Sequence, residues 1–69
     1  MMMVGIVKWF RTAQGYGFIT VGEHDYFVHA TDLPPDVTLE EGMVVEFEPG
    51  PSLPGRRAAG RAYKVRVID

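Results

Sequence analysis

The spacing of glycine and proline limits this chain more than any other feature. Eight glycines and five prolines occupy 13 of the 69 positions, and they cluster between short apolar segments, as turns between strands do. No segment keeps a 3.6-residue apolar period over ten or more residues, so little helix is expected. The sequence therefore predicts an all-β protein built from short strands.

Five strands are predicted. They cover residues 4–12, 16–21, 25–30, 43–48 and 57–67. Residues 39–42 are expected to form a single helical turn or a β-turn, and residues 49–55 a loop. Five short strands expose unpaired edges unless their sheet closes, and a small barrel removes those edges. We therefore expect residues 1–69 to form one domain, a small barrel.

The absence of cysteine removes several classes of protein at once. Disulfide frameworks, thiolate zinc sites, iron–sulfur clusters and cysteine nucleophiles all need this residue. A small secreted domain would need such cross-links, so a cytoplasmic location is expected. No apolar run approaches the roughly 20 residues of a membrane span, and the first ten residues lack the features of a signal peptide. No membrane partner is expected.

The net charge of −2 is unevenly distributed along the chain. Residues 12–55 carry eight acidic residues and no lysine or arginine, whereas five of the seven basic residues lie within 56–69 and two within 1–11. If both ends of the chain share one sheet, the basic residues form a local patch that binds anions. Alternatively, they are solvated charges that keep the terminal strands soluble.

Side-chain alternation assigns the faces of residues 16–21 and 25–30. The aliphatic set is expected in the barrel interior: Ile19, Val21 and Val28. The outward set consists of rings: Tyr16, Phe18, Phe27 and His29. A soluble protein avoids such a group unless it binds a ligand. Nucleobases are suitable ligands for such a surface, because each base that stacks on an aromatic ring contributes about 1–3 kcal/mol, independent of the nucleotide sequence. Gly15 and Gly17 are expected to keep the space around Tyr16 open.

Residues 8–11 add two cations and two aromatic residues to this surface. Lys8 attracts phosphate, and Trp9 offers a further stacking surface. Regular alternation cannot place Trp9 and Phe10 on the same face, so either a bulge turns one of them or one belongs to the core. Phe10 and Phe47 are expected in the core.

Evidence for catalysis is missing from the sequence. His24, Asp25 and His29 come closest to a metal-binding set, but His24 is predicted to lie in a turn and to face elsewhere. The acid pairs at 40–41 and at 46 and 48 have neither an apolar pocket nor a nucleophile beside them. We therefore expect no enzymatic activity, metal, cofactor or small-molecule substrate.

Four segments resemble the bacterial cold-shock proteins and the cold-shock domain of eukaryotic Y-box proteins: KWF at 8–10, QGYGFITV at 14–21, YFVHATDL at 26–33 and LEEG at 39–42. The resemblance covers essentially the whole chain. It implies a five-stranded antiparallel oligonucleotide-binding (OB) fold, a barrel that binds single-stranded RNA and DNA. It also implies a role as RNA chaperone or as regulator of transcription or translation. We expect a monomer that prefers pyrimidine-rich strands.

The resemblance also selects contact residues. Those at matching positions are Lys8, Trp9, Tyr16, Phe18, Phe27 and His29. Arg56 is added, since the pair Arg56–Arg57 can compensate electrostatically for contacts that this chain has lost.

The chain departs from the family pattern at several positions. Gln14 stands where lysine is common, and Ala30 and Val37 where aromatic residues are. Each lost ring implies binding weaker by about 1–3 kcal/mol at most. Arg61 stands where the family tends to have valine, which leaves the register of the last strand open. The alternative function is a small β-barrel interaction module that binds an extended or proline-rich peptide on its aromatic surface.

Overall fold

The computed structural model describes residues 1–51 and 58–69. Its elements, in chain order, are β1 (Met3–Arg11), β2 (Tyr16–Val21), β3 (His24–His29), a 3₁₀ turn η1 (Ala30–Asp32), β4 (Val44–Gly50) and β5 (Gly60–Val67). The described residues contain no helix with the length and hydropathy of a membrane span.

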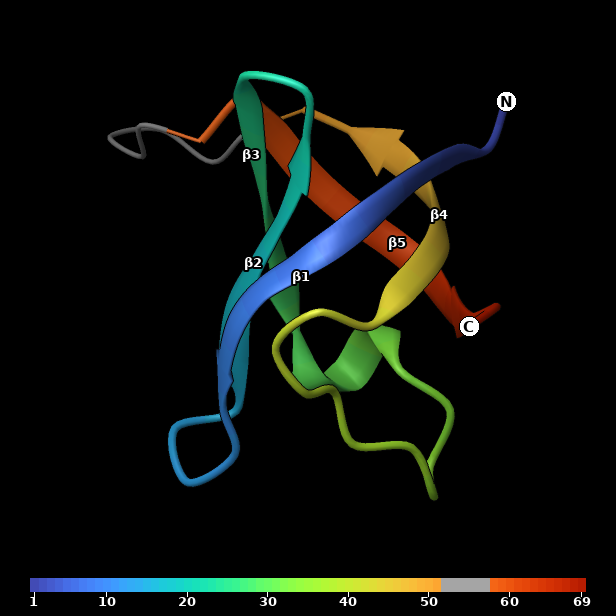
Figure 1. The fold of residues 1–69 in the computed structure, drawn as a ribbon. Helices are drawn as coiled ribbons and strands as arrows, with labels where there is room; N and C mark the ends of the chain where they lie inside the picture. Colours follow the sequence, from blue (N-terminus) through green and yellow to red (C-terminus); the bar gives the residue numbers. More distant parts are fainter. Residues whose placement is uncertain (52–57) are drawn as a thin grey trace.

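The five strands close into a barrel in the order β1-β2-β3-β5-β4 (Figure 1), which confirms the predicted architecture. The long strand β1 pairs with β4 through its first half and with β2 through its second. Four strand pairs are antiparallel, as expected, and the pair β3–β5 is the exception because it is parallel, so the sheet is mixed. This arrangement places the last strand directly beside the third.

The first four predicted strands agree with the observed ones to within two residues at each end. The last strand was predicted to begin at residue 57, which lies outside the described residues, and the observed β5 begins three residues later, at Gly60. The strand predicted at 16–21 is exact. β4 continues through Pro49 and Gly50, which were predicted to lie in a loop, and residues 52–57 lie outside the described part of the chain. Residues 39–42 form no helix: the amide of Met43 donates to the carbonyl of Glu40 at 3.1 Å, as in a β-turn. The turn η1 was not predicted.

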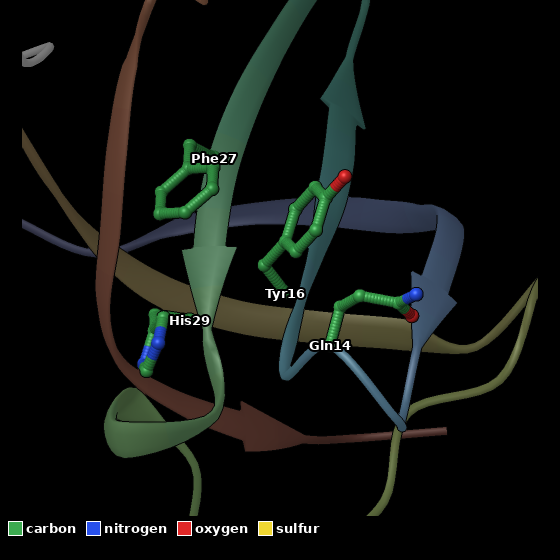
Figure 2. A pocket seen from close by; sticks show the side chains of 4 residues that line it. All are labelled: Gln14, Tyr16, Phe27 and His29. Atoms are coloured by element: carbon green, nitrogen blue, oxygen red, sulfur yellow. The ribbon is translucent and has the colours of Figure 1, made fainter.

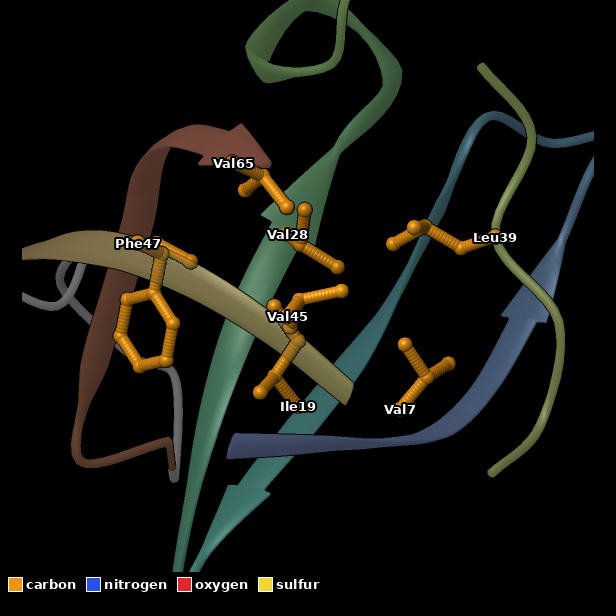
Figure 3. Close-up of a cluster of buried hydrophobic side chains, with 8 residues drawn as sticks. Val7, Ile19, Val28, Leu39, Val45, Phe47 and Val65 are labelled. Atoms are coloured by element: carbon orange, nitrogen blue, oxygen red, sulfur yellow. The ribbon is translucent and has the colours of Figure 1, made fainter. Parts of the chain in front are cut away.

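The barrel interior is filled by side chains from every strand and from one connection (Figure 3). They are Val7, Ile19, Val28, Leu39, Val45, Phe47, Ala62 and Val65. The core positions predicted for Ile19, Val28 and Phe47 are confirmed. Phe10 and Val21 are only partly buried, although both pack against this core. Leu39 reaches into the interior from the connection before β4, so that connection is fixed by apolar packing.

Lys64 in β5 adopts a left-handed backbone conformation, with φ of 52°. It lies where the β4–β5 register shifts, and a bulge of this kind favours glycine. Its exposed ion pair with Glu48, 3.6 Å long, contributes little. We expect Lys64→Gly to raise the free energy of unfolding by about 0.5–1 kcal/mol. A left-handed conformation costs an L-residue about 1–2 kcal/mol, which glycine avoids, but the greater flexibility of glycine in the unfolded chain offsets part of this gain.

Thermal unfolding followed by circular dichroism measures this effect, with an expected rise in Tm of about 2–8 °C. Arg66→Gly is the matched control. Arg66 is an exposed cation of the same strand without positive φ, so its replacement should lower Tm. Equal losses in both variants would contradict the backbone argument.

Candidate functional site

Four rings gather on the outer surface of the β2–β3 hairpin, as alternation predicted. Tyr16 lies opposite His29, and Phe18 lies opposite Phe27. The rings of Tyr16 and Phe27 are stacked, with centroids 5.9 Å apart and an interplanar angle of 25°. Phe18 meets Phe27 edge-on at 5.9 Å. The hairpin therefore presents one continuous aromatic surface.

A bulge in β1 brings Trp9 to the same surface. Val7 pairs with Ile19 and Trp9 pairs with Phe18, so Lys8 is an extra residue in β1. This extra residue reverses the alternation. Trp9 then faces outward, with its ring 5.2 Å from that of Phe18 and 5.6 Å from that of Tyr16. The sequence left two explanations open for residues 9 and 10: a bulge, or a core position for one of them. Both hold, because the bulge turns Trp9 outward and Phe10 packs against the core. We call the five residues Trp9, Tyr16, Phe18, Phe27 and His29 the ring face.

Phe27 is the covered centre of the ring face. Its relative exposure is 5%, because Tyr16, Phe18 and the guanidinium of Arg61 lie around it. The predicted outward position of Phe27 is confirmed, but neighbouring side chains cover its ring. Phe27 supports the partly exposed rings of its neighbours.

Gly17 has a different role from the predicted one. A Cβ at this position would lie 2.7 Å from the Cα of Phe10 and against the carbonyl oxygen of Trp9. Gly17 is buried, so the missing side chain makes room for Phe10 beneath the sheet and not for a ligand above it. Gly15, by contrast, has φ of 78° and serves the turn between β1 and β2.

An open pocket of about 420 Å³ lies at one end of the ring face (Figure 2). Its walls are Gln14, Tyr16, Phe27 and His29. The His29 ring is held in place by its own turn, since its Nδ1 accepts from the amide of Thr31 at 3.2 Å. In the neutral imidazole the proton then sits on Nε2, which can donate. The pocket combines flat rings with an amide and an imidazole, groups that can bind the edge of a base.

Two cations flank the ring face on the side of β1. The guanidinium of Arg11 lies 5.1 Å from the Trp9 ring. Lys8 is 53% exposed and donates to Asp25 at 2.9 Å. This hydrogen bond, with a second one from Thr20, holds the pKa of Asp25 below its ordinary value of 3.8 against the opposing effect of burial. Because an exposed pair contributes only about 0–1 kcal/mol, Lys8 can exchange Asp25 for a phosphate at little cost.

Arg61 is a residue of this site that the sequence did not reveal. It lies opposite Phe27 in the β3–β5 pair, and its guanidinium is 5.9 Å from the Phe27 ring. The only sequence signal was the basic final segment, whose register was open. Arg56, predicted as a contact, lies outside the described residues.

The described residues contain no group of three His, Cys, Asp or Glu side chains that could hold a metal ion. His24 and His29 lie at opposite ends of β3, and Asp25 is engaged by Lys8 and Thr20.

A closed five-stranded barrel with almost no helix and a surface cluster of rings defines the class of this protein, a small barrel consistent with the OB fold. The family model of the 'Cold-shock' DNA-binding domain matches residues 3–66. The chain therefore belongs to the cold-shock domain family, whose members bind nucleic acids, and the resemblance inferred from its motifs is confirmed.

Relatives of known name agree with this assignment. The chain is 50% identical over 70 residues to a cold shock-like protein of Thermotoga maritima, with 97% of this chain and all of the relative covered. It is 52% identical over 50 residues to the cold shock protein CspA of Staphylococcus aureus (strain USA300), which covers 68% of this chain and 76% of that protein. CspA of Staphylococcus haemolyticus matches to the same extent.

Proposed function

We propose that residues 1–69 are a single cold-shock domain that binds single-stranded RNA and DNA by stacking bases on the ring face, without catalysis. We further propose that the protein is a cytoplasmic monomer that acts on pyrimidine-rich strands as an RNA chaperone or as a regulator of transcription or translation. The observation that carries it is the unbroken contact of Trp9, Tyr16, Phe18 and Phe27 over three strands.

The expected affinity follows from the number of open rings. Trp9, Tyr16, Phe18 and His29 are all partly exposed. At about 1–3 kcal/mol for each stacked base, four platforms contribute roughly 4–12 kcal/mol before the cost of ordering the strand is subtracted. Binding in the roughly micromolar range is therefore expected.

The cations beside the ring face add a salt-dependent contribution. Lys8 and Arg11 lie on β1, and Arg61 lies on β5. If three or four phosphates are neutralised, the slope of log affinity against log salt is expected to be about −2 to −3. The acidic net charge does not prevent this, because the field near the contact surface decides the encounter.

Trp9 fluorescence tests the proposal directly, because Trp9 is the only tryptophan and its ring contacts Tyr16 and Phe18. A short oligo-dT or oligo-U should quench its emission saturably, and more weakly as salt rises. A duplex of equal length is the control and should quench far less, because its bases are already stacked. A proline-rich peptide tests the alternative function. Quenching by the peptide, with none by either single strand, would contradict the proposal.

A further inference from the structure

The ring face does not end at β3. Because β5 lies parallel to β3, Arg61 stands beside Phe27 on the same surface of the barrel. Its neighbour Ala62 is buried, and Tyr63 is partly exposed, as alternation requires. The two outward residues of β5 therefore continue the aromatic surface by one further strand.

The guanidinium of Arg61 is held in one place. It lies 5.0 Å from the Tyr63 ring and 5.9 Å from the Phe27 ring. Its Nε and Nη2 both donate to the same carboxylate oxygen of Asp32, at 3.2 and 3.0 Å. The Arg61 side chain is 22% exposed and that of Asp32 is 13% exposed. A guanidinium fixed in this way loses little further conformational entropy when it binds a ligand.

Part of this guanidinium remains available. The two bonds to Asp32 use two of its five N–H donors, and no other acceptor among the described residues engages Arg61. Free N–H groups at a partly exposed edge suit the oxygens of a phosphate, which arginine binds through charge-assisted hydrogen bonds. The other ion pairs of β5, Lys64–Glu48 and Arg66–Glu46, are more exposed and involve no ring.

From these observations we propose that the path of the bound strand continues from the ring face onto β5, where Arg61, positioned by Asp32 and Tyr63, binds a backbone phosphate. This inference rests on the proposed single-strand binding and adds a phosphate site that the family motifs do not contain. Asp32 has two opposing effects: it orients the guanidinium, and its charge repels the phosphate.

The main experiment removes the ion pair without changing the net charge. In the double variant Asp32→Asn/Arg61→Gln, an amide pair replaces the ions and no charge is left without a partner. Its matched control is Glu46→Gln/Arg66→Gln, which removes an exposed pair between β4 and β5. Both are titrated with oligo-dT of about four and about eight nucleotides by Trp9 fluorescence, at several salt concentrations.

The proposal predicts that the Asp32/Arg61 variant binds the longer oligonucleotide about five- to tenfold more weakly at low salt, with a log–log slope shallower by about 0.7, the value for one phosphate on a single strand. The short oligonucleotide can be accommodated on the ring face alone, so its affinity for the Asp32/Arg61 variant should be nearly the same as for the wild type. The control variant should match the wild type in both affinity and slope.

If the Asp32/Arg61 variant keeps the affinity and slope of a wild type that binds normally, the phosphate site is overturned and the proposed binding on the ring face stands. If the wild type itself does not bind, both proposals fall.

A second variant guards against misfolding of the first. Asp32→Asn alone keeps Arg61 and removes the competing charge, and Glu46→Gln makes the same change in net charge elsewhere. We expect Asp32→Asn to bind the longer oligonucleotide about threefold or more tighter than Glu46→Gln does. The amide oxygen introduced by Asp32→Asn can still accept from the Arg61 guanidinium, so the orienting contact is kept and only the repulsion is removed. Equal affinities of these two variants would therefore also overturn the proposal.

Discussion

Replacing Gly17 by alanine is expected to lower the free energy of unfolding by about 3 kcal/mol or more, the upper range for overpacking a small core. The new Cβ would lie 2.7 Å from the Cα of Phe10 and 2.8 Å from its Cδ2, besides its contact with the backbone of Trp9. Backbone atoms cannot move aside as a flexible side chain can, so β1 and β2 must separate where the bulge turns Trp9 outward.

Urea or thermal unfolding measures this loss, and Gly22→Ala is its control. Gly22 has φ of 60°, and nothing lies within 4 Å of a Cβ built there. Its replacement should therefore cost only the left-handed strain, about 1–2 kcal/mol. If Gly17→Ala costs no more than Gly22→Ala, then Phe10 does not pack beneath Gly17 as described.

Phe18→Ala is expected to weaken oligo-dT binding by about 1–3 kcal/mol while the barrel stays folded. Phe18 is partly exposed and contacts the rings of Trp9 and Phe27, so its removal opens the middle of the ring face. Phe27→Ala should weaken binding as well, but it should also lower stability by about 3 kcal/mol, because Phe27 is only 5% exposed.

Trp9 quenching gives the affinities, and circular dichroism in urea gives the stabilities. Ile68→Ala removes a side chain that is 44% exposed and lies outside the ring face, so it serves as the control for loss of apolar surface. A Phe18→Ala protein with a native spectrum and wild-type affinity would show that bases do not stack on the ring face.

Much of this site could be predicted because alternation is a local property. The outward places of Tyr16, Phe18 and His29 and the buried places of Ile19 and Val28 follow from strand geometry within one hairpin. A bulge is not local in this sense. The residues around Lys8 would also suit a regular strand, and only pairing with β2 shows that one of them is extra.

Other features depend on strands that are far apart in the sequence. The burial of Phe27 is completed by Arg61 from β5, a neighbour fixed by the parallel pairing. The role of Gly17 depends on the side chain of Phe10 in another strand. No pattern within residues 16–29 carries this information, so the sequence predicted where these residues lie and not what covers them.

The order of the strands also has a consequence for folding during synthesis. All five residues of the ring face lie within the first 29 positions, but β5 supplies Ala62 and Val65 to the core and joins β3 to β4. At about 5–20 residues per second, roughly 2–8 s pass between the completion of β3 and that of β5. Until β5 pairs with it, an emerged β3 has a free edge, and an unpaired edge is a template for pairing with another chain. The nascent polypeptide is therefore most vulnerable to aggregation after its binding residues have been made and before its barrel can close.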